Sequence, residues 1–227
     1  MNKYYKAYEK RYKQMYELKE LWEVSDKTPE VFNTILKYNI NKNDKILELG
    51  CGEGRDAFYL LDNGYNLLAV DYSKTVINKC NELTNNKYVN NFRQFDLIED
   101  KLNDKFDFIY SVAVIHMFVE ENHRDAFYKF IREHLKDDGI ALIISMGDGD
   151  TEFKTDINKA FDDTMRKNVN SGMEVMVATT SCRVKNLLNM RKEIIKNELK
   201  ILDEKIIDDV PNFDKCISFI VKKQIVK

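Results

Sequence analysis

Three glycines at alternate positions follow a short apolar segment within residues 48–55, which read ELGCGEGR. Alternate glycines permit positive φ angles and remove side chains that would keep a ligand away from the backbone. A helix beginning near Arg55 would also point free N–H groups at that ligand. The pattern therefore predicts a ligand-binding turn. A tight turn without a ligand is the alternative, but it would not need three glycines.

Two aspartates follow this turn at the ends of further apolar segments. Asp71 lies about 20 residues beyond the glycines, where a carboxylate accepts hydrogen bonds from both ribose hydroxyls of a nucleotide. Asp96 follows the next predicted strand and could accept a hydrogen bond from an adenine amino group. Each has a plainer interpretation as a loop or cap carboxylate. Together with the glycines, they favour an adenosine-containing ligand.

These features alone do not separate a nicotinamide dinucleotide from another adenosine-containing ligand. Gly52, Gly54 and Ala57 also satisfy the G-x-G-x-x-A pattern of nicotinamide dinucleotide sites. An NAD(P)-dependent oxidoreductase therefore stays open as an alternative. It is disfavoured because no Tyr-x-x-x-Lys pair and no large substrate domain follow the fingerprint.

Strand and helix patterns alternate along the middle of the chain, with short apolar runs separated by amphipathic segments. This alternation predicts an α/β fold with a Rossmann-like sheet, seven-stranded and mostly parallel, with helices on both faces and an antiparallel C-terminal strand pair. Predicted strands cover residues 45–49, 66–70, 88–95, 106–114, 140–146, 200–207 and 216–223. Predicted helices cover 55–63, 73–83, 124–135 and 186–199. Gly139 is interpreted as the stop signal after the third helix.

We predict a single domain, 1–227, made of four segments. Residues 1–43 form an N-terminal helical cap, 44–147 the binding core, 148–183 a small lid insertion and 184–227 a C-terminal helix and strand pair. The lid carries a short helical pattern followed by an extended stretch over 176–181. In the cap, Tyr4, Tyr8, Tyr12 and Tyr16 recur every four residues on one helix face, which either packs on the domain or covers a pocket. The helical pattern of the lid consists of Ile157, Ala160, Phe161 and Met165.

Composition excludes several other classes of protein. The 227 residues carry 36 Lys and Arg against 38 Asp and Glu, a net charge of −2, which gives no electrostatic case for a nucleic-acid or membrane partner. No apolar run is long enough to span a membrane, and no signal-peptide pattern is present. Four scattered cysteines and three histidines predict neither a disulfide scaffold nor a metal site. We expect a cytoplasmic monomer or homodimer.

The string from Ile46 to Gly54 resembles the first motif of the class I S-adenosylmethionine (AdoMet) dependent methyltransferases. Further segments resemble that family's motifs in the same order. Residues 52–64 are most similar to its small-molecule members of the tellurite-resistance and thiopurine methyltransferase type. The resemblance implies a methyltransferase with AdoMet as cofactor and a small-molecule acceptor; a protein that binds AdoMet without transferring its methyl group is a further alternative. The further matching segments are 69–73, 92–97, 106–111 and 135–139.

The resemblance also implies which residues contact AdoMet. At the methionine end, Arg55 would pair with the carboxylate, as its planar donors suit, and Ser111 would offer its carbonyl to the ammonium. At the nucleoside end, Asp71 would hold the ribose and Tyr72 would lie against adenine. The remaining implied contacts are the backbone of Gly50, Cys51 and Gly52 to the methionine part, Glu48 to the ammonium through water, and Asp96 with the Leu97 amide to the adenine edge.

Methyl transfer from a sulfonium is an in-line displacement that mainly requires alignment and a dry site. His116, five residues beyond Ser111, is the best-placed candidate for a general base, although a lone histidine in an apolar run is more often a packing residue. Trp22 could close over the ligand or anchor the helix that starts at Thr28. The lid acids could favour a cationic acceptor, although a solvated acidic loop is the commoner explanation; they are Asp148, Asp150, Glu152 and Asp156.

Overall fold

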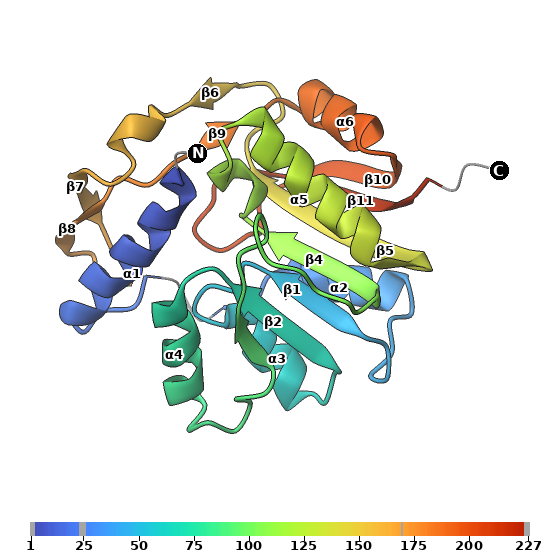
Figure 1. Ribbon diagram of the computed structural model, residues 1–227, viewed down its shortest axis with the longest axis horizontal. Coiled ribbons are helices and arrows are strands. Elements are labelled where there is room, and N and C mark those ends of the chain that lie inside the picture. Colours follow the sequence, from blue (N-terminus) through green and yellow to red (C-terminus); the bar gives the residue numbers. More distant parts are fainter. Residues whose placement is uncertain (1–2, 23–25, 169, 225–227) are drawn as a thin grey trace.

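The computed structural model describes residues 3–22, 26–168 and 170–224. The parts of the predicted segments on residues 1–2, 23–25, 169 and 225–227 therefore lie outside the described residues. A seven-stranded sheet in the order β10-β11-β5-β4-β1-β2-β3 forms the centre (Figure 1). Strands β1 to β5 pair in parallel, and β10 and β11 add an antiparallel pair, which confirms the predicted fold class. The strands are β1 (Ile46–Leu49), β2 (Leu67–Asp71), β3 (Phe92–Gln94), β4 (Phe106–Val112), β5 (Leu135–Met146), β10 (Leu199–Ile207) and β11 (Cys216–Lys223).

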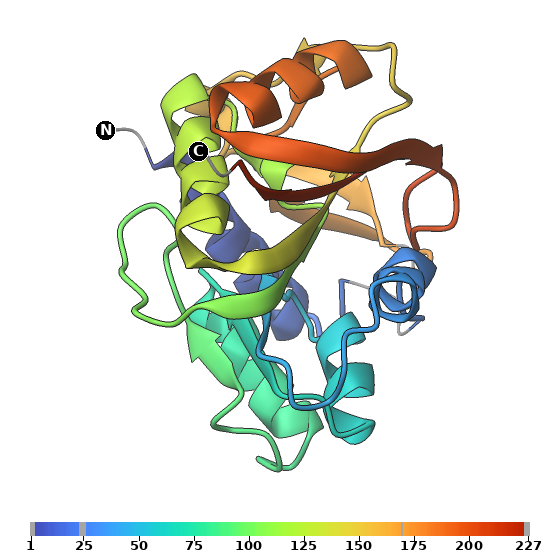
Figure 2. The same ribbon diagram turned by 90° about the vertical axis from the view of Figure 1, so that its right-hand side faces the viewer.

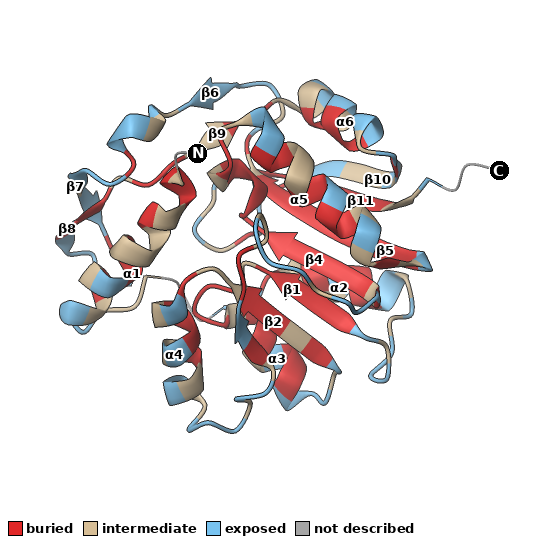
Figure 3. Cartoon of the chain, in the orientation of Figure 1, coloured by how far each residue is buried: buried red, intermediate tan, exposed pale blue. Residues whose placement is uncertain are grey.

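Helices cover both faces of this sheet because successive strand residues point to opposite sides. On β1, Leu47 and Leu49 pack in one apolar cluster with α5 and α6, whereas Ile46 packs in the other with α2, α3 and α4 (Figure 2). The sheet between them is buried along most of its length (Figure 3). No helix of the described part of the chain is long and apolar enough to cross a membrane. The helices are α2 (Pro29–Lys37), α3 (Arg55–Asp62), α4 (Lys74–Leu83), α5 (Glu121–His134) and α6 (Leu187–Lys196).

Gly139 has a different role from the one predicted. The sequence analysis placed it at the end of a helix, but α5 ends at His134 and Gly139 lies inside β5. A Cβ atom there would lie 2.8 Å from the Phe106 carbonyl oxygen on β4. The glycine is therefore needed for the close approach of two strands rather than for a helix terminus.

The third strand is shorter than predicted. Only Phe92–Gln94 pair with β2, and the preceding residues form turns. Asn85 and Asn86 both have positive φ angles, of 50° and 59°. Asparagine tolerates this conformation better than other non-glycine residues, so the pair turns the chain before the strand begins.

The helical pattern predicted in the lid is wrong beyond its first turn. A 3-10 turn, η3 (Ile157–Lys159), is followed by β7 (Asp163–Lys167), which pairs with β8 (Glu174–Ala178). Phe161 and Met165 are exposed, so the apolar spacing reflects no buried helix face. The lid's other short strands, β6 (Phe153–Lys154) and β9 (Arg183–Val184), pair with each other. The division into four segments stays a prediction.

The predicted N-terminal helix is present as η1 (Tyr4–Lys6) and α1 (Ala7–Glu17). It packs against β8 of the lid and against α4, beside the end of the sheet toward which β4 points (Figure 1). Tyr4 is fully buried, and its hydroxyl accepts hydrogen bonds from the backbone N–H groups of Val119 and Glu120 at 2.9 Å. Tyr4 thus packs on the domain, whereas Tyr8 and Tyr12 line a cavity over the carboxyl ends of the strands.

Candidate binding site

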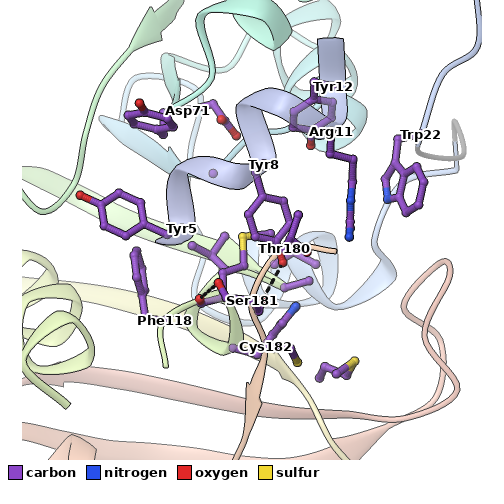
Figure 4. A pocket seen from close by; sticks show the side chains of 18 of the residues that line it. Tyr5, Tyr8, Arg11, Tyr12, Trp22, Asp71, Phe118, Thr180, Ser181 and Cys182 are labelled. Atoms are coloured by element: carbon purple, nitrogen blue, oxygen red, sulfur yellow. Dashed lines mark hydrogen bonds between the residues drawn. The ribbon is translucent and has the colours of Figure 1, made fainter. Parts of the chain in front are cut away.

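A cavity of about 450 Å³ lies beyond the carboxyl ends of β1, β2 and β4, where open α/β sheets bind ligands. Residues following the strands form its floor, and α1 with residues 179–182 forms its roof (Figure 4). Two predicted site residues, Gly52 and Ser111, do not line it. The predicted residues that do are Trp22, Glu48, Gly50, Cys51, Arg55, Asp71, Tyr72, Asp96, Leu97 and His116.

The glycine turn approaches β2 and β4 closely. Gly50 has a φ of +70°, and a Cβ atom there would lie 2.5 Å from Cγ2 of Val114, so a larger residue would not fit. The N–H groups of Gly50 and Cys51 donate to the Val70 carbonyl at 2.8 and 3.0 Å. Because these amides are engaged, the turn offers a ligand its carbonyl oxygens and Cα hydrogens rather than these two N–H groups.

The Asp71 carboxylate is fixed by two backbone groups. Its Oδ2 accepts a hydrogen bond from the Gly52 N–H at 3.0 Å, and its Oδ1 accepts one from the Ser73 N–H at 2.8 Å. Each oxygen keeps a second lone pair for a further donor. Burial raises the pKa of Asp71 to about 6, against the hydrogen bonds from Ser73 and Gly52, which lower it. The group is therefore ionised at neutral pH and loses its charge in mildly acidic solution.

The second carboxylate, Asp96, contacts the N-terminal segment. The Tyr5 hydroxyl donates to its Oδ2 at 3.2 Å, and the Lys6 ammonium lies 3.2 Å from the same oxygen. Lys6 also lies 4.7 Å from the centre of the Tyr72 ring, whose edge-to-face partner is Tyr5. Asp96 and Tyr72 are thus brought together, as expected from the sequence. The side chains of Tyr5 and Lys6 that contact them were not predicted as site residues.

Arg55, at the start of α3, carries a buried donor without a partner. Its side chain is 8% exposed, and its Nη2 lies 3.7 Å from Oδ2 of Asp56. Its Nε is buried and has no hydrogen-bond partner among the described residues. A buried unpaired donor is costly, so this arrangement favours an acceptor supplied by a ligand.

His116 lies in the 3-10 turn η2 (Ile115–Met117), directly after β4. Its Nδ1 is buried and has no partner within the described ranges. Burial, with a smaller contribution from the positive charge of Arg124, lowers the pKa of His116 to about 4. The imidazole is therefore neutral across the physiological range, and His116 is one of the residues that line the cavity.

The roof of the cavity is tied down through α1. The Tyr8 hydroxyl donates to the Ser181 carbonyl at 3.0 Å, and Arg11 donates to the carbonyls of Ala178 and Thr179 at 2.7 to 3.1 Å. The Arg11 guanidinium lies 4.7 Å from the Trp22 ring, and Figure 4 shows the two side by side. Trp22 thus belongs to the cover, and its backbone N–H donates to Glu53.

The family model for the tellurite resistance protein TehB matches residues 7–181, from the start of α1 to the end of the roof segment. This match spans more than half of the chain. The chain belongs to the TehB family. A TehB-family relative from Haemophilus influenzae Rd, a probable S-adenosyl-L-methionine-dependent methyltransferase, is 30% identical over 102 residues. That match covers 44% of this chain and 35% of the relative.

Solved methyltransferases share the fold of this TehB-family chain. The CcbJ methyltransferase from Streptomyces caelestis superimposes with a TM-score of 0.70 at 13% identity, covering 96% of this chain and 99% of that one. The 1,6-didemethyltoxoflavin-N1-methyltransferase from Burkholderia thailandensis gives a TM-score of 0.67 at 15% identity, with coverages of 94% and 85%. At such identities the likeness concerns the fold alone.

Two residues of the TehB-family site have positive φ angles and were not predicted from the sequence. Ala113 and Thr180 both line the cavity and have φ angles of 58° and 63°. Such a conformation is costly for a β-branched residue, and strain of this kind concentrates at binding sites. No motif marks Thr180, whereas Arg11 could have been found because it shares a helix face with Tyr8 and Tyr12.

The acidic residues of the lid do not line the cavity. Asp148 accepts hydrogen bonds from the backbone N–H groups of Asp150 and Thr151, and Asp156 accepts one from Asn158 at the start of η3. Glu152 accepts hydrogen bonds from residues at the start of α6. Their contacts are structural, so they give no support to the expectation of a cationic acceptor.

Proposed function

We propose that this chain is an AdoMet-dependent methyltransferase that transfers a methyl group to a small-molecule acceptor by in-line displacement. One observation carries the proposal: Arg55, whose buried Nε has no hydrogen-bond partner among the described residues, lines the same cavity as the carboxylates of Asp71 and Asp96. These groups match the two ends of AdoMet, a carboxylate at one and a nucleoside at the other. Membership of the TehB family supports the same assignment.

The residues of the chain would bind AdoMet, orient it and shield the reacting atoms from water. Arg55 would pair with the methionine carboxylate, Asp71 with the ribose hydroxyls, and Asp96 with the adenine amino group. Bound AdoMet supplies an electrophilic methyl group on a sulfonium. Because positive charge disappears from sulfur during transfer, an apolar and closed surrounding favours the reaction. The roof formed by α1 and residues 179–182 would exclude water from the reacting atoms.

Calorimetric titration with AdoMet, with NAD as the comparison ligand, tests the cofactor. We expect micromolar AdoMet binding and no signal for NAD. Binding of NAD alone would overturn the proposal and favour the oxidoreductase. AdoMet binding without transfer to any acceptor would favour a ligand sensor instead. A cytoplasmic location and a monomeric or homodimeric state stay predictions from the sequence.

Arg55→Ala should weaken AdoMet binding by about tenfold, because it removes a charged hydrogen bond worth about 1.5 kcal/mol. Calorimetry measures the change, and the Arg93→Ala variant is a matched control, since Arg93 is exposed on β3 outside the cavity. Equal affinities of the Arg55→Ala variant and the unmodified protein would exclude Arg55 from the binding site.

His116→Ala should lower turnover by about tenfold, less than a well-matched general base contributes, because a pKa of about 4 makes the imidazole a weak base. Affinity for AdoMet should not change. Turnover and binding are measured separately, by transfer of labelled methyl groups and by calorimetry. Unchanged turnover would leave His116 as a packing residue.

A further inference from the structure

Once the residues assigned to AdoMet are set aside, the charged side chains left in the cavity lining are all cationic. What we infer from them rests on the proposed function. The lining carries the carboxylates of Glu48, Asp71 and Asp96, all of which the proposal gives to AdoMet, as it does Arg55. Three cationic side chains then remain in the lining: Arg11, Arg166 and Lys167. Lys167 lies opposite Glu174 in the β7–β8 hairpin and, as the neighbour of Arg166 on the strand, points to the other face. Arg11 and Arg166 are therefore the cations left for a further ligand.

Each of these cations keeps hydrogen-bond donors that the protein does not use. Arg166 is exposed on β7 and forms no ion pair or side-chain hydrogen bond within the described residues. Arg11 uses its Nε and Nη2 on backbone carbonyls, which leaves Nη1 without a protein acceptor in the same part of the chain. The cavity mouth therefore presents positive donors that have no acceptor among the described residues.

The proximity of these two cations is itself unfavourable. Burial lowers the pKa of Arg11, and the nearby positive charge of Arg166 lowers it further. Like charges at a partly closed site repel each other until an anion lies between them. An anionic ligand would relieve this repulsion and use the free donors together.

The walls next to these cations are aromatic and apolar. Tyr8, Tyr12, Trp22 and Phe213 line the cavity, and Figure 4 shows the first three around the Arg11 side chain. Flat rings of this kind favour a planar aromatic ligand. Because about 450 Å³ must hold both AdoMet and acceptor, that ligand must be small.

We propose that the methyl acceptor is a small aromatic carboxylate, with its ring between the aromatic side chains of the cover and its carboxylate held by Arg166 and Nη1 of Arg11. The acceptor's nucleophilic atom would then point inward, toward the sheet ends where the methyl group is placed. An anionic acceptor is the opposite of the cationic acceptor that the acidic lid residues could favour in the sequence analysis.

The test compares aromatic carboxylates with their uncharged amides on the protein saturated with S-adenosylhomocysteine. The probes are benzoate, 4-hydroxybenzoate, 4-aminobenzoate and indole-3-carboxylate, each paired with its carboxamide and titrated by calorimetry. We expect carboxylates to bind about tenfold more tightly than the amides, as an ion pair at a partly shielded site implies. In the Arg166→Gln variant, this preference should fall to less than about twofold while amide binding is unchanged.

The control is the Lys154→Gln variant, which removes the same charge from an exposed lid position outside the cavity lining. It should keep the full preference. Three results would overturn the proposal: amides that bind as well as acids, a preference that survives loss of Arg166, or no carboxylate binding by a protein that still binds S-adenosylhomocysteine. A protein that does not bind S-adenosylhomocysteine would refute the proposed function as well, which separates the two failures.

Discussion

Asp71→Asn is expected to weaken AdoMet binding by about two orders of magnitude, because hydrogen bonds to a charged acceptor contribute about 1.5–3 kcal/mol each and the ribose offers two donors. The substitution also replaces one acceptor oxygen by an N–H₂ group, which repels the Gly52 or Ser73 N–H that now donates to it. Calorimetric titration of both proteins at neutral pH measures the loss.

The same residue gives the binding reaction a pH dependence. Burial raises the pKa of Asp71 to about 6, so below this pH the ionised fraction falls about tenfold per unit, and AdoMet affinity should fall with it. Above pH 7 the affinity should be constant. Because the pKa is raised in the fold, protonation of this group stabilises the folded state between the unfolded pKa and about 6. The loss of affinity at pH 5 is therefore not a loss of folding through Asp71.

The control for this experiment is Asp62→Asn, at the exposed end of α3, which should behave like the unmodified protein. The Asp71→Asn variant should show a nearly flat affinity between pH 5 and 7. A variant that retains the decline of the unmodified protein would assign the pH dependence to another group.

Glu193→Ala is expected to lower the free energy of unfolding by about 3–5 kcal/mol, since it leaves a buried charge without its partner. Arg124 is 1% exposed, and its Nε and Nη2 each donate to a different Glu193 oxygen at 2.8 Å. Its Nη1 donates to the Ile115 carbonyl, beside His116. The pair thus joins α5 and α6 to the turn that carries the candidate base. Urea unfolding measures the loss.

Asp125→Ala is the matched control on the same two helices. Asp125 pairs with Lys196 at the surface, so its removal should cost less than about 1 kcal/mol. Replacing both Arg124 and Glu193 with methionine and leucine should recover much of the stability, because the Arg124 charge is then gone and Lys185, which also pairs with Glu193, keeps its second partner Glu121. A Glu193→Ala protein as stable as the Asp125→Ala protein would show that the buried pair contributes nothing.

The centre of the sheet was predictable from sequence because strands such as β1 and β2 are short, apolar and bounded by glycine or polar residues. Strand β11 has the predicted bounds, and Ser73 caps α4, its hydroxyl accepting a hydrogen bond from the Val76 N–H. The lid was not predictable in the same way. Its hairpin is held by backbone pairing of β7 with β8, and residues such as Met165 remain exposed on it.

Most of the residues on the floor of the cavity were predicted from the sequence, whereas Arg11 and Thr180 in its roof were not. Asp71 and the glycine turn are close in sequence to the strands that place them, so their spacing alone indicates a shared site. Arg11 reaches the backbone of Ala178 and Thr179 only because α1 packs on the lid. That contact depends on packing between distant segments, which no local pattern encodes. The roles of the individual site residues stay predictions until binding is measured.

The attachment of α1 to distant segments also determines when the cavity is completed during folding. The Tyr5 hydroxyl bonds to Asp96, 91 residues away, and the Tyr8 hydroxyl bonds to Ser181, 173 residues away. Closing such long loops is entropically costly and slow compared with forming local βα units. During synthesis, α1 leaves the ribosome well before residue 181, to which it is joined in the folded chain. The floor of the cavity would therefore fold before its roof.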